Sequence, residues 1–303
     1  MDRKTTSIVI TIGVPVYNGE KYIERALISI IQQTYSNFEV IISDNASTDS
    51  TGEICEKIIG NDDRFCYVRR KSKISAENNF KFIIEKATTD LFVFLAADDY
   101  WDPEFLELTI ARLVEEKDAV ACISKVNFIK DGVFLFNAYG DFEIRGSITV
   151  RLRKYFHDAT DNSRFYAVYR REAMQDSFQD LPRIHSLDWY IVALTLIRGD
   201  HLRVDKTLMY REAPDLDKYV RSLKYDNKGY VFGEFFPILP LTMALFRRLS
   251  LMEYFKIALS LLRLNLIMHI HYTKIEFPNS IYCKTITIMG RFMANCCGVK
   301  KIR

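Results

Sequence analysis

Up to residue 125 the chain alternates between two hydrophobic patterns. Short apolar runs rich in β-branched residues predict strands, and between them apolar residues recur every three or four positions, as on one face of a helix. The expected strands are 8–14, 38–42, 65–68, 91–95 and 119–123, and the expected helices are 22–31, 48–59, 76–86 and 103–117. Because repeated strand–helix units build a sheet covered by helices, we expect an α/β fold with a Rossmann-like, mostly parallel sheet.

The rest of the chain divides into a mixed segment and a helical tail. Strand patterns occur at 126–129, 133–136, 164–170 and 204–210, and a helix pattern occurs at 187–198. The pair Asp131–Gly132 between the first two of these strands is typical of a hairpin turn. From residue 233 onward only helical patterns occur, so we expect three parts, 1–125, 126–232 and 233–303.

The tail is both apolar and basic. Between Phe246 and Arg303 it holds ten Lys or Arg residues against two Glu residues. Within 249–268 the polar residues fall on one narrow stripe, which leaves a broad apolar face. Such a helix suits the surface of an anionic membrane, and it equally suits a helical subdomain or a contact between two copies of the chain. Both interpretations stay open.

Composition excludes several classes of protein. Of the 303 residues, 49% are hydrophobic and 27% are charged, which excludes a disordered chain. The net charge of +3 is too small for a dedicated nucleic-acid-binding protein. The six cysteines form no C-x-x-C pair, which predicts reduced thiols. With no recognisable signal peptide or membrane-spanning stretch, we expect a cytoplasmic protein, either free or held by its tail at the inner face of the cell membrane.

Three polar loops follow the first, second and fourth expected strands. In an open parallel sheet, ligands bind beyond the carboxyl ends of the strands. The residues at these ends are Pro15, Tyr17 and Asn18, then Asp44 to Asp49, then Asp98 and Asp99. Asp44 ends a buried strand, where a carboxylate can accept a hydrogen bond from the N–H group of a nucleobase.

The adjacent acids Asp98 and Asp99 indicate a metal site. Two neighbouring carboxylates repel each other unless a cation joins them. Mg²⁺ and Mn²⁺ prefer oxygen ligands and bind through one or two carboxylates plus substrate phosphates. The alternative is that one of the two acids caps the next helix, but Asp102, directly before Pro103, is better placed to do so. We therefore expect Mn²⁺ or Mg²⁺ at Asp98 and Asp99, bound to a diphosphate.

Together, three motifs resemble those of the family 2 glycosyltransferases of GT-A fold: Pro15-Val16-Tyr17-Asn18, Asp44 to Asp49, and Phe94 to Trp101. The resemblance is close over residues 7–125 and weaker over 126–212. It implies that residues 1–125 bind a nucleotide-sugar and that 126–232 bind the acceptor and complete the domain. In the family, the Asp matching Asp44 contacts the base, and the pair matching Asp98 and Asp99 holds ribose and a divalent metal.

The resemblance also implies a set of donor-binding residues: Pro15, Tyr17, Asn18, Asp44, Asn79 and Asp98. One position departs from the family pattern. Ala96 stands where the common D-x-D-D motif has its first acid. We expect metal binding to survive this change, in a weaker or differently shared form.

A transferase that inverts the anomeric centre needs a base to take the proton of the acceptor hydroxyl. Asp188 lies where the helix 187–198 begins, and the helix dipole favours an ionised carboxylate there. From spacing alone, a simple capping acid is the better explanation. The resemblance implies that Asp188 is the base, because the family carries an acid–aromatic pair at this distance, matching Asp188–Trp189. His185 is the second candidate.

These observations predict an inverting, metal-dependent glycosyltransferase, of hexosyltransferase type, in cell-surface polysaccharide synthesis. The expected donor is a nucleoside diphosphate sugar, with a UDP-sugar as first choice, and the expected acceptor is a saccharide or lipid-linked saccharide. We expect no nucleic-acid partner, and a homo-oligomer stays open. One alternative is a non-catalytic nucleotide-sugar-binding protein derived from a transferase, which Ala96 supports. The other is a sugar nucleotidyltransferase, which the lack of a glycine-rich loop after the first strand disfavours.

Overall fold

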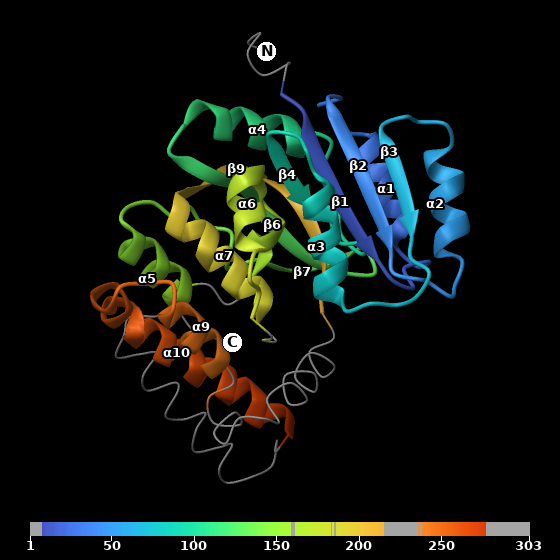
Figure 1. Ribbon diagram of the computed structural model, residues 1–303. Coiled ribbons are helices and arrows are strands. Elements are labelled where there is room, and N and C mark those ends of the chain that lie inside the picture. Colours follow the sequence, from blue (N-terminus) through green and yellow to red (C-terminus); the bar gives the residue numbers. More distant parts are fainter. Residues whose placement is uncertain are drawn as a thin grey trace. The chain divides into compact units, whose positions relative to one another are not determined.

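Figure 1 shows the computed structural model of the chain, which describes residues 8–158, 161–182, 184, 186–214, 236 and 238–276. The chain forms two compact units. The first comprises Met1–Leu181 and Ile191–Ala213, and the second comprises Pro182–Tyr190 and Pro214–Arg303. All the strands in the described part of the chain belong to the first unit.

Four parallel strands form one half of the sheet, in the order β3-β2-β1-β4. They are β1 (Ile10–Val16), β2 (Phe38–Asp44), β3 (Phe65–Arg69) and β4 (Leu91–Phe94). β1 is buried along its whole length and β2 along most of it, as expected for strands covered on both faces. The predicted strand–helix alternation is confirmed, and β1 and β2 continue past the predicted ends to Val16 and Asp44.

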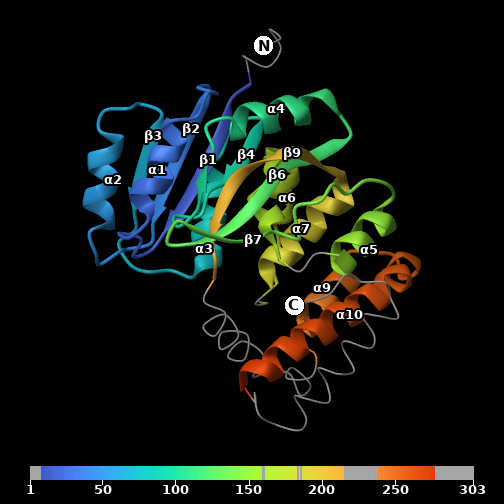
Figure 2. The same ribbon diagram turned by 180° about the vertical axis from the view of Figure 1, so that it is seen from behind.

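Helices cover both faces of this half, with α3 on one face and α1 on the other (Figures 1 and 2). The helices here are α1 (Ile23–Ile31), α2 (Thr51–Ile59), α3 (Ala76–Lys86) and α4 (Phe105–Glu115). α3 has the predicted bounds because the Ser75 hydroxyl accepts a hydrogen bond from the amide of Asn78, which caps its first turn. It packs directly on β1, since a Cβ at Gly13 would lie 2.5 Å from Ile83.

The second half of the sheet is mixed and continues in the order β4-β8-β6-β9-β5, with β7 paired to β6. Its strands are β5 (Tyr100–Trp101), β6 (Ala119–Lys130), β7 (Val133–Asn137), β8 (Val168–Arg170) and β9 (Asp200–Glu212). β6 and β9 are parallel, whereas β8 is antiparallel to both its neighbours and β5 is antiparallel to β9. The α/β fold class is confirmed, with antiparallel pairs confined to this half.

Two strand predictions need correction. The patterns at 119–123 and 126–129 belong to one continuous strand, β6, which turns into β7 at the predicted hairpin of Asp131 and Gly132. The predicted strand 164–170 is a 3-10 turn, Ser163–Tyr166, followed by the short β8. The turn forms because the amide and the hydroxyl of Ser163 both donate to Oδ1 of Asp161.

The remaining helices are α5 (Ile148–Asp158), α6 (Arg171–Ser177), α7 (Leu187–Arg198), α9 (Leu239–Phe246) and α10 (Leu251–Glu276). α7 has its predicted bounds. α10 begins with a capping box, because the amide of Ser250 donates to the carboxylate of Glu253 and the amide of Glu253 donates to the hydroxyl oxygen of Ser250. Among the described residues, no helix is both long and apolar enough to cross a bilayer. His185, the predicted boundary at residue 232 and the tail beyond residue 276 lie outside the described residues.

Candidate active site at the ends of the parallel strands

The loops that follow β1, β2 and β4 meet at one edge of the sheet. The amide of Asn18 donates to Oγ of Ser47 at 2.9 Å, and the amide of Thr48 donates to Oδ1 of Asn18 at 2.9 Å. The third loop lies against the first, since a Cβ at Gly19 would be 3.6 Å from the Cβ of Ala97. The three loops therefore converge as the sequence predicted.

Two residues of these loops have a left-handed backbone, Asn18 with φ 50° and Ala46 with φ 60°. For a residue with a side chain, this conformation costs about 1–2 kcal/mol. Asn tolerates it comparatively well, whereas Ala46 has no polar side chain to offset the cost. Residues held in such conformations cluster at binding and catalytic sites. The loops are thus held in a shape that local preference alone would not choose.

Asp44 is fully buried, and its carboxylate is fixed from two sides. Oδ1 accepts a hydrogen bond from the amide of Ser47 at 2.8 Å, and Oδ2 accepts one from the hydroxyl of Tyr67 at 2.7 Å. Burial and the neighbouring carboxylate raise the pKa of Tyr67, which keeps the phenol protonated as a donor. Sequence reasoning missed Tyr67, although the register of β2 and β3 places it beside Ile42, two residues before Asp44.

Asp98 presents an exposed carboxylate. Its side chain makes no hydrogen bond or ion pair with any residue that the structure describes, whereas its backbone oxygen accepts a hydrogen bond from Nη2 of Arg25 at 2.6 Å. A carboxylate left open at the carboxyl end of a parallel sheet is available to a ligand or a cation.

Asp99, its neighbour, points into the protein and is 2% exposed. Oδ2 accepts from Nε of Arg211 at 3.0 Å, and Oδ1 accepts from the amide of Glu212 at 2.9 Å. Burial raises the pKa of Asp99 to about 6, and the Arg211 guanidinium opposes that rise. Both oxygens are therefore already engaged by the end of β9, so the two acids of the motif have different surroundings.

Arg211 extends this contact into a partly buried network of hydrogen bonds. Its Nη1 donates to Oγ of Ser163 at 3.3 Å, and that hydroxyl donates to Oδ1 of Asp161 at 2.6 Å. The other oxygen of Asp161 accepts from the amides of Tyr139 and Gly140. The network connects the acidic loop with the loop after β7, and sequence reasoning did not find it.

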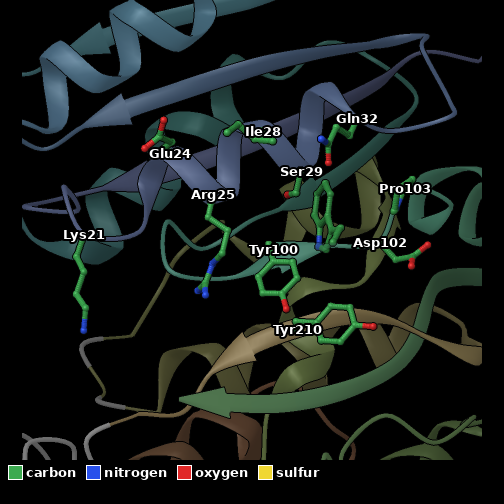
Figure 3. A pocket seen from close by; sticks show the side chains of 11 residues that line it. Lys21, Glu24, Arg25, Ile28, Ser29, Gln32, Tyr100, Asp102, Pro103 and Tyr210 are labelled. Carbon is green, nitrogen blue, oxygen red and sulfur yellow. The ribbon is translucent and has the colours of Figure 1, made fainter. Parts of the chain in front are cut away.

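Arg25 connects the Asp98 loop to a surface groove. Its guanidinium carbon lies 4.7 Å from the centre of the Tyr100 ring, which stacks on the ring of Tyr210 at 4.8 Å. Figure 3 shows these side chains in a groove of about 670 Å³ between α1 and the paired strands β5 and β9. Arg25 thus holds the backbone of Asp98 from the side of this groove.

The other predicted donor-binding residues differ in exposure. Pro15 is buried within β1, whereas Tyr17 is exposed and has the ammonium of Lys73 3.7 Å above its ring. Asn79 is buried in α3, where Oδ1 accepts from the hydroxyl of Ser43 and Nδ2 donates to the Ser43 carbonyl. Asn79 therefore fixes β2 next to Asp44, and contact of Asn79 with the donor stays a prediction.

Asp188 lies in the first turn of α7, as predicted, and is half-buried. It belongs to the second unit together with Trp189 and Tyr190, both of which are buried. Tyr190 accepts a hydrogen bond from Nε of Arg248 at 3.0 Å, which connects the start of α7 to the segment between α9 and α10. The role of Asp188 as a base stays a prediction.

The oxygen ligands at the carboxyl ends of the parallel strands fit a divalent cation whose coordination is completed by a substrate. Among the described residues, no group of three or more His, Cys, Asp or Glu side chains gathers at one point. A cage made by the protein alone is therefore absent from this part of the chain. The exposed Asp98 carboxylate fits the other mode, in which one or two carboxylates and substrate phosphates complete the coordination of Mg²⁺ or Mn²⁺.

A comparison with protein families matches residues 11–178 to the model of glycosyl transferase family 2. Among curated proteins, "Glycosyltransferase GlyA" of Streptococcus pneumoniae serotype 4 is 33% identical over 134 residues. That alignment covers 44% of this chain and 19% of GlyA, so the chain spans about a fifth of this relative.

Two solved structures share the fold. Staphylococcus aureus TarS 1–349, in complex with UDP-GlcNAc, matches with a TM-score of 0.57 and 16% identity, over 98% of this chain and 93% of that one. The mannosyltransferase PcManGT of Pyrobaculum calidifontis, in complex with GDP-Man and Mn²⁺, matches with a TM-score of 0.57 and 16% identity, over 94% and 80%. At these identities the likeness shows the fold.

Proposed function

Since the chain belongs to the family 2 glycosyltransferases, we propose that it transfers a sugar from a nucleoside diphosphate to a hydroxyl group of a saccharide or lipid-linked saccharide. The observation that carries this proposal is the exposed Asp98 carboxylate at the carboxyl edge of the parallel strands, which is open to a cation on a diphosphate. Asp44 ends a strand of the same sheet with a fixed orientation, and because its side chain is fully buried, a nucleobase would reach it only once the carboxylate becomes accessible.

The nucleotide would lie across the ends of β1 and β2. The Asp44 carboxylate, oriented by Tyr67, would accept a hydrogen bond from the base. Tyr17 and Asn18 are exposed beside it and would contact the nucleoside. The two solved structures that share the fold are complexes with UDP-GlcNAc and GDP-Man, which supports a nucleotide-sugar donor for this chain. We propose a UDP-sugar as the first donor to test.

Asp98 would hold Mn²⁺ or Mg²⁺, and the cation when bound would neutralise the charge that develops on the departing diphosphate. Asp99 would position Asp98, because the hydrogen bonds from Arg211 and Glu212 to the Asp99 carboxylate fix the loop that carries both acids to the end of β9. Arg25 would add to this rigidity through the backbone oxygen of Asp98. We therefore place the metal on Asp98 and treat direct ligation by Asp99 as secondary.

The reaction would invert the anomeric centre. The acceptor oxygen attacks the anomeric carbon from the side opposite the diphosphate, and a new carbon–oxygen bond forms. The bond from that carbon to the phosphate oxygen breaks, and its electron pair leaves with the nucleoside diphosphate. The proton of the acceptor hydroxyl passes to the carboxylate of Asp188, the proposed general base.

The test begins with a thermal-shift screen of UDP, GDP, dTDP and CMP, with and without Mn²⁺. We expect one nucleoside diphosphate to raise the melting temperature, and Mn²⁺ to increase that shift, because a ligand of the native state stabilises it. The variant D98N should lose the increase caused by Mn²⁺, and D63N, which removes an exposed carboxylate elsewhere, should keep it. No shift with any nucleotide would refute the proposal.

A non-catalytic protein that binds nucleotide-sugars is the second candidate, and Ala96 favours it. Such a protein would bind the donor through Asp44 and Asp98 without cleaving it. The two candidate functions are distinguished by slow hydrolysis of a nucleotide-sugar, in which water takes the place of the acceptor and nucleoside diphosphate is released. A transferase releases it at a rate that depends on Mn²⁺, whereas a binding protein leaves the nucleotide-sugar intact.

A further inference from the structure

α10 carries a row of exposed apolar side chains that do not pack against the rest of the described chain. Leu251, Met252, Phe255, Leu259 and Leu262 are between 56% and 80% exposed. Their spacing places them on one side of a helix with 3.6 residues per turn. We call this row the α10 stripe. Contiguous exposed apolar surface of this kind marks an interaction site.

The α10 stripe is distinct from the side of the helix that packs against protein. Ile257, Leu261 and Leu264 are at most 3% exposed. On this packed side, Oδ1 of Asn265 accepts a hydrogen bond from the amide of Ile238, just before α9. α10 is thus apolar on two sides, and burial against protein accounts for only one of them.

Charge indicates what covers the α10 stripe. Lys256 follows Met252 by one helical turn, and Arg263 follows Leu259 by one turn, so both cations border the stripe. The acid in this stretch, Glu253, is bound to Ser250 in the capping box at the start of the helix. One edge of the stripe is therefore basic. A second copy of the same face offers no opposite charge, whereas an anionic lipid surface does.

We infer that α10 lies in the interface of an anionic membrane, with the α10 stripe facing the acyl chains and Lys256 and Arg263 facing the lipid headgroups. Amphipathic helices bind in this way through buried apolar area and attraction to anionic lipids. The inference concerns a partner of the second unit, and it holds whether or not the proposed transfer reaction is correct.

The test is sedimentation of the full chain with vesicles of phosphatidylcholine, alone or mixed with phosphatidylglycerol. We expect binding to the mixed vesicles that weakens as salt is added, because salt screens surface charge. Leu259, the most exposed residue of the stripe, is the residue to change. L259D should weaken vesicle binding about tenfold or more, since burial of a leucine contributes about 1.5–3 kcal/mol. L259M, which keeps the side chain apolar, should bind as the wild type does.

Neither variant should lower the melting temperature, because the side chain of Leu259 is exposed. Failure of the wild-type chain to bind mixed vesicles would overturn the inference, and so would equal binding by L259D. Light scattering, which measures the oligomeric state, tests the alternative that a second copy of the chain covers the α10 stripe. A wild-type dimer that L259D converts to a monomer, without vesicle binding, would assign the stripe to a contact between copies and overturn the membrane interpretation.

Discussion

The Nε atom of Arg211, at the end of β9, lies 3.0 Å from Oδ2 of Asp99, in the loop after β4. The two residues are 112 positions apart in the chain, and this contact joins the two halves of the sheet at the candidate site. It explains why two adjacent acids differ, since Asp99 is held by the protein and Asp98 is left open.

Loss of the Arg211 side chain should destabilise the fold. R211A leaves the Asp99 carboxylate buried without its cation, and breaking a buried ion pair costs about 3–5 kcal/mol. Chemical denaturation should show this loss in the free energy of unfolding. The double variant D99N/R211M, which removes both charges, should recover much of it. If R211A unfolds at the wild-type denaturant concentration, the ion pair contributes nothing.

Asp99 should make stability depend on pH in a defined direction. Its pKa in the native state is raised from 3.8 to about 6, so the folded chain holds this proton more tightly than the unfolded chain does. Asp99 therefore contributes most stability below the unfolded pKa, and this contribution is lost as pH rises through about 6. The free energy of unfolding should fall from pH 4 to pH 7 more steeply in the wild type than in D99N. Parallel curves would refute the assignment.

Tyr67 should matter for folding as well as for nucleotide binding. Y67F removes the hydroxyl that donates to Asp44 at 2.7 Å and keeps the ring in place. A hydrogen bond to a charged group contributes about 1.5–3 kcal/mol to stability, so the free energy of unfolding should fall by about this amount, and nucleoside diphosphate affinity should fall as well because the Asp44 carboxylate loses one of the donors that orient it. Calorimetric titration measures this affinity. The Mn²⁺ concentration that supports half-maximal binding should stay unchanged, because Tyr67 does not touch Asp98.

Asp188 should affect the chemical step alone. If it is the general base, D188N should lower kcat by about 10²–10⁴-fold with the KM for the donor unchanged. Initial rates with a saturating acceptor measure both constants. E172Q, a change in a first-turn acid of α6, is the matched control and should keep wild-type rates. A kcat of D188N near that of the wild type would assign Asp188 to helix capping.

Much of the fold follows from local pattern. The bounds of α3 and α7 agree with the apolar spacing of residues 76–86 and 187–198, and in α3 the structure adds the Ser75 cap at the first turn. The three loops of the site were predictable because parallel strands end at the same edge. The turn at Ser163–Tyr166 was not, since its apolar residues suit a strand and the side chain of Asp161 decides the outcome.

The partners of the site acids were beyond local pattern. Arg211 contacts Asp99 because β9 pairs with β5 and β6. The spacing of apolar residues along the chain does not predict which strands pair. The sequence therefore indicated two equivalent acids at positions 98 and 99. Only the packing of β9 shows that the Asp99 carboxylate already accepts hydrogen bonds from Arg211 and Glu212.

If the exposed Asp98 carboxylate holds a cation that in turn binds the diphosphate, calorimetric titration with the nucleoside diphosphate should detect it. Mn²⁺ should tighten binding to the wild type and to D63N, and D98N should bind about 10-fold or more weakly in Mn²⁺ yet equal the wild type in the presence of a chelator. Wild-type affinity of D98N in Mn²⁺ would show that Asp98 does not hold the cation.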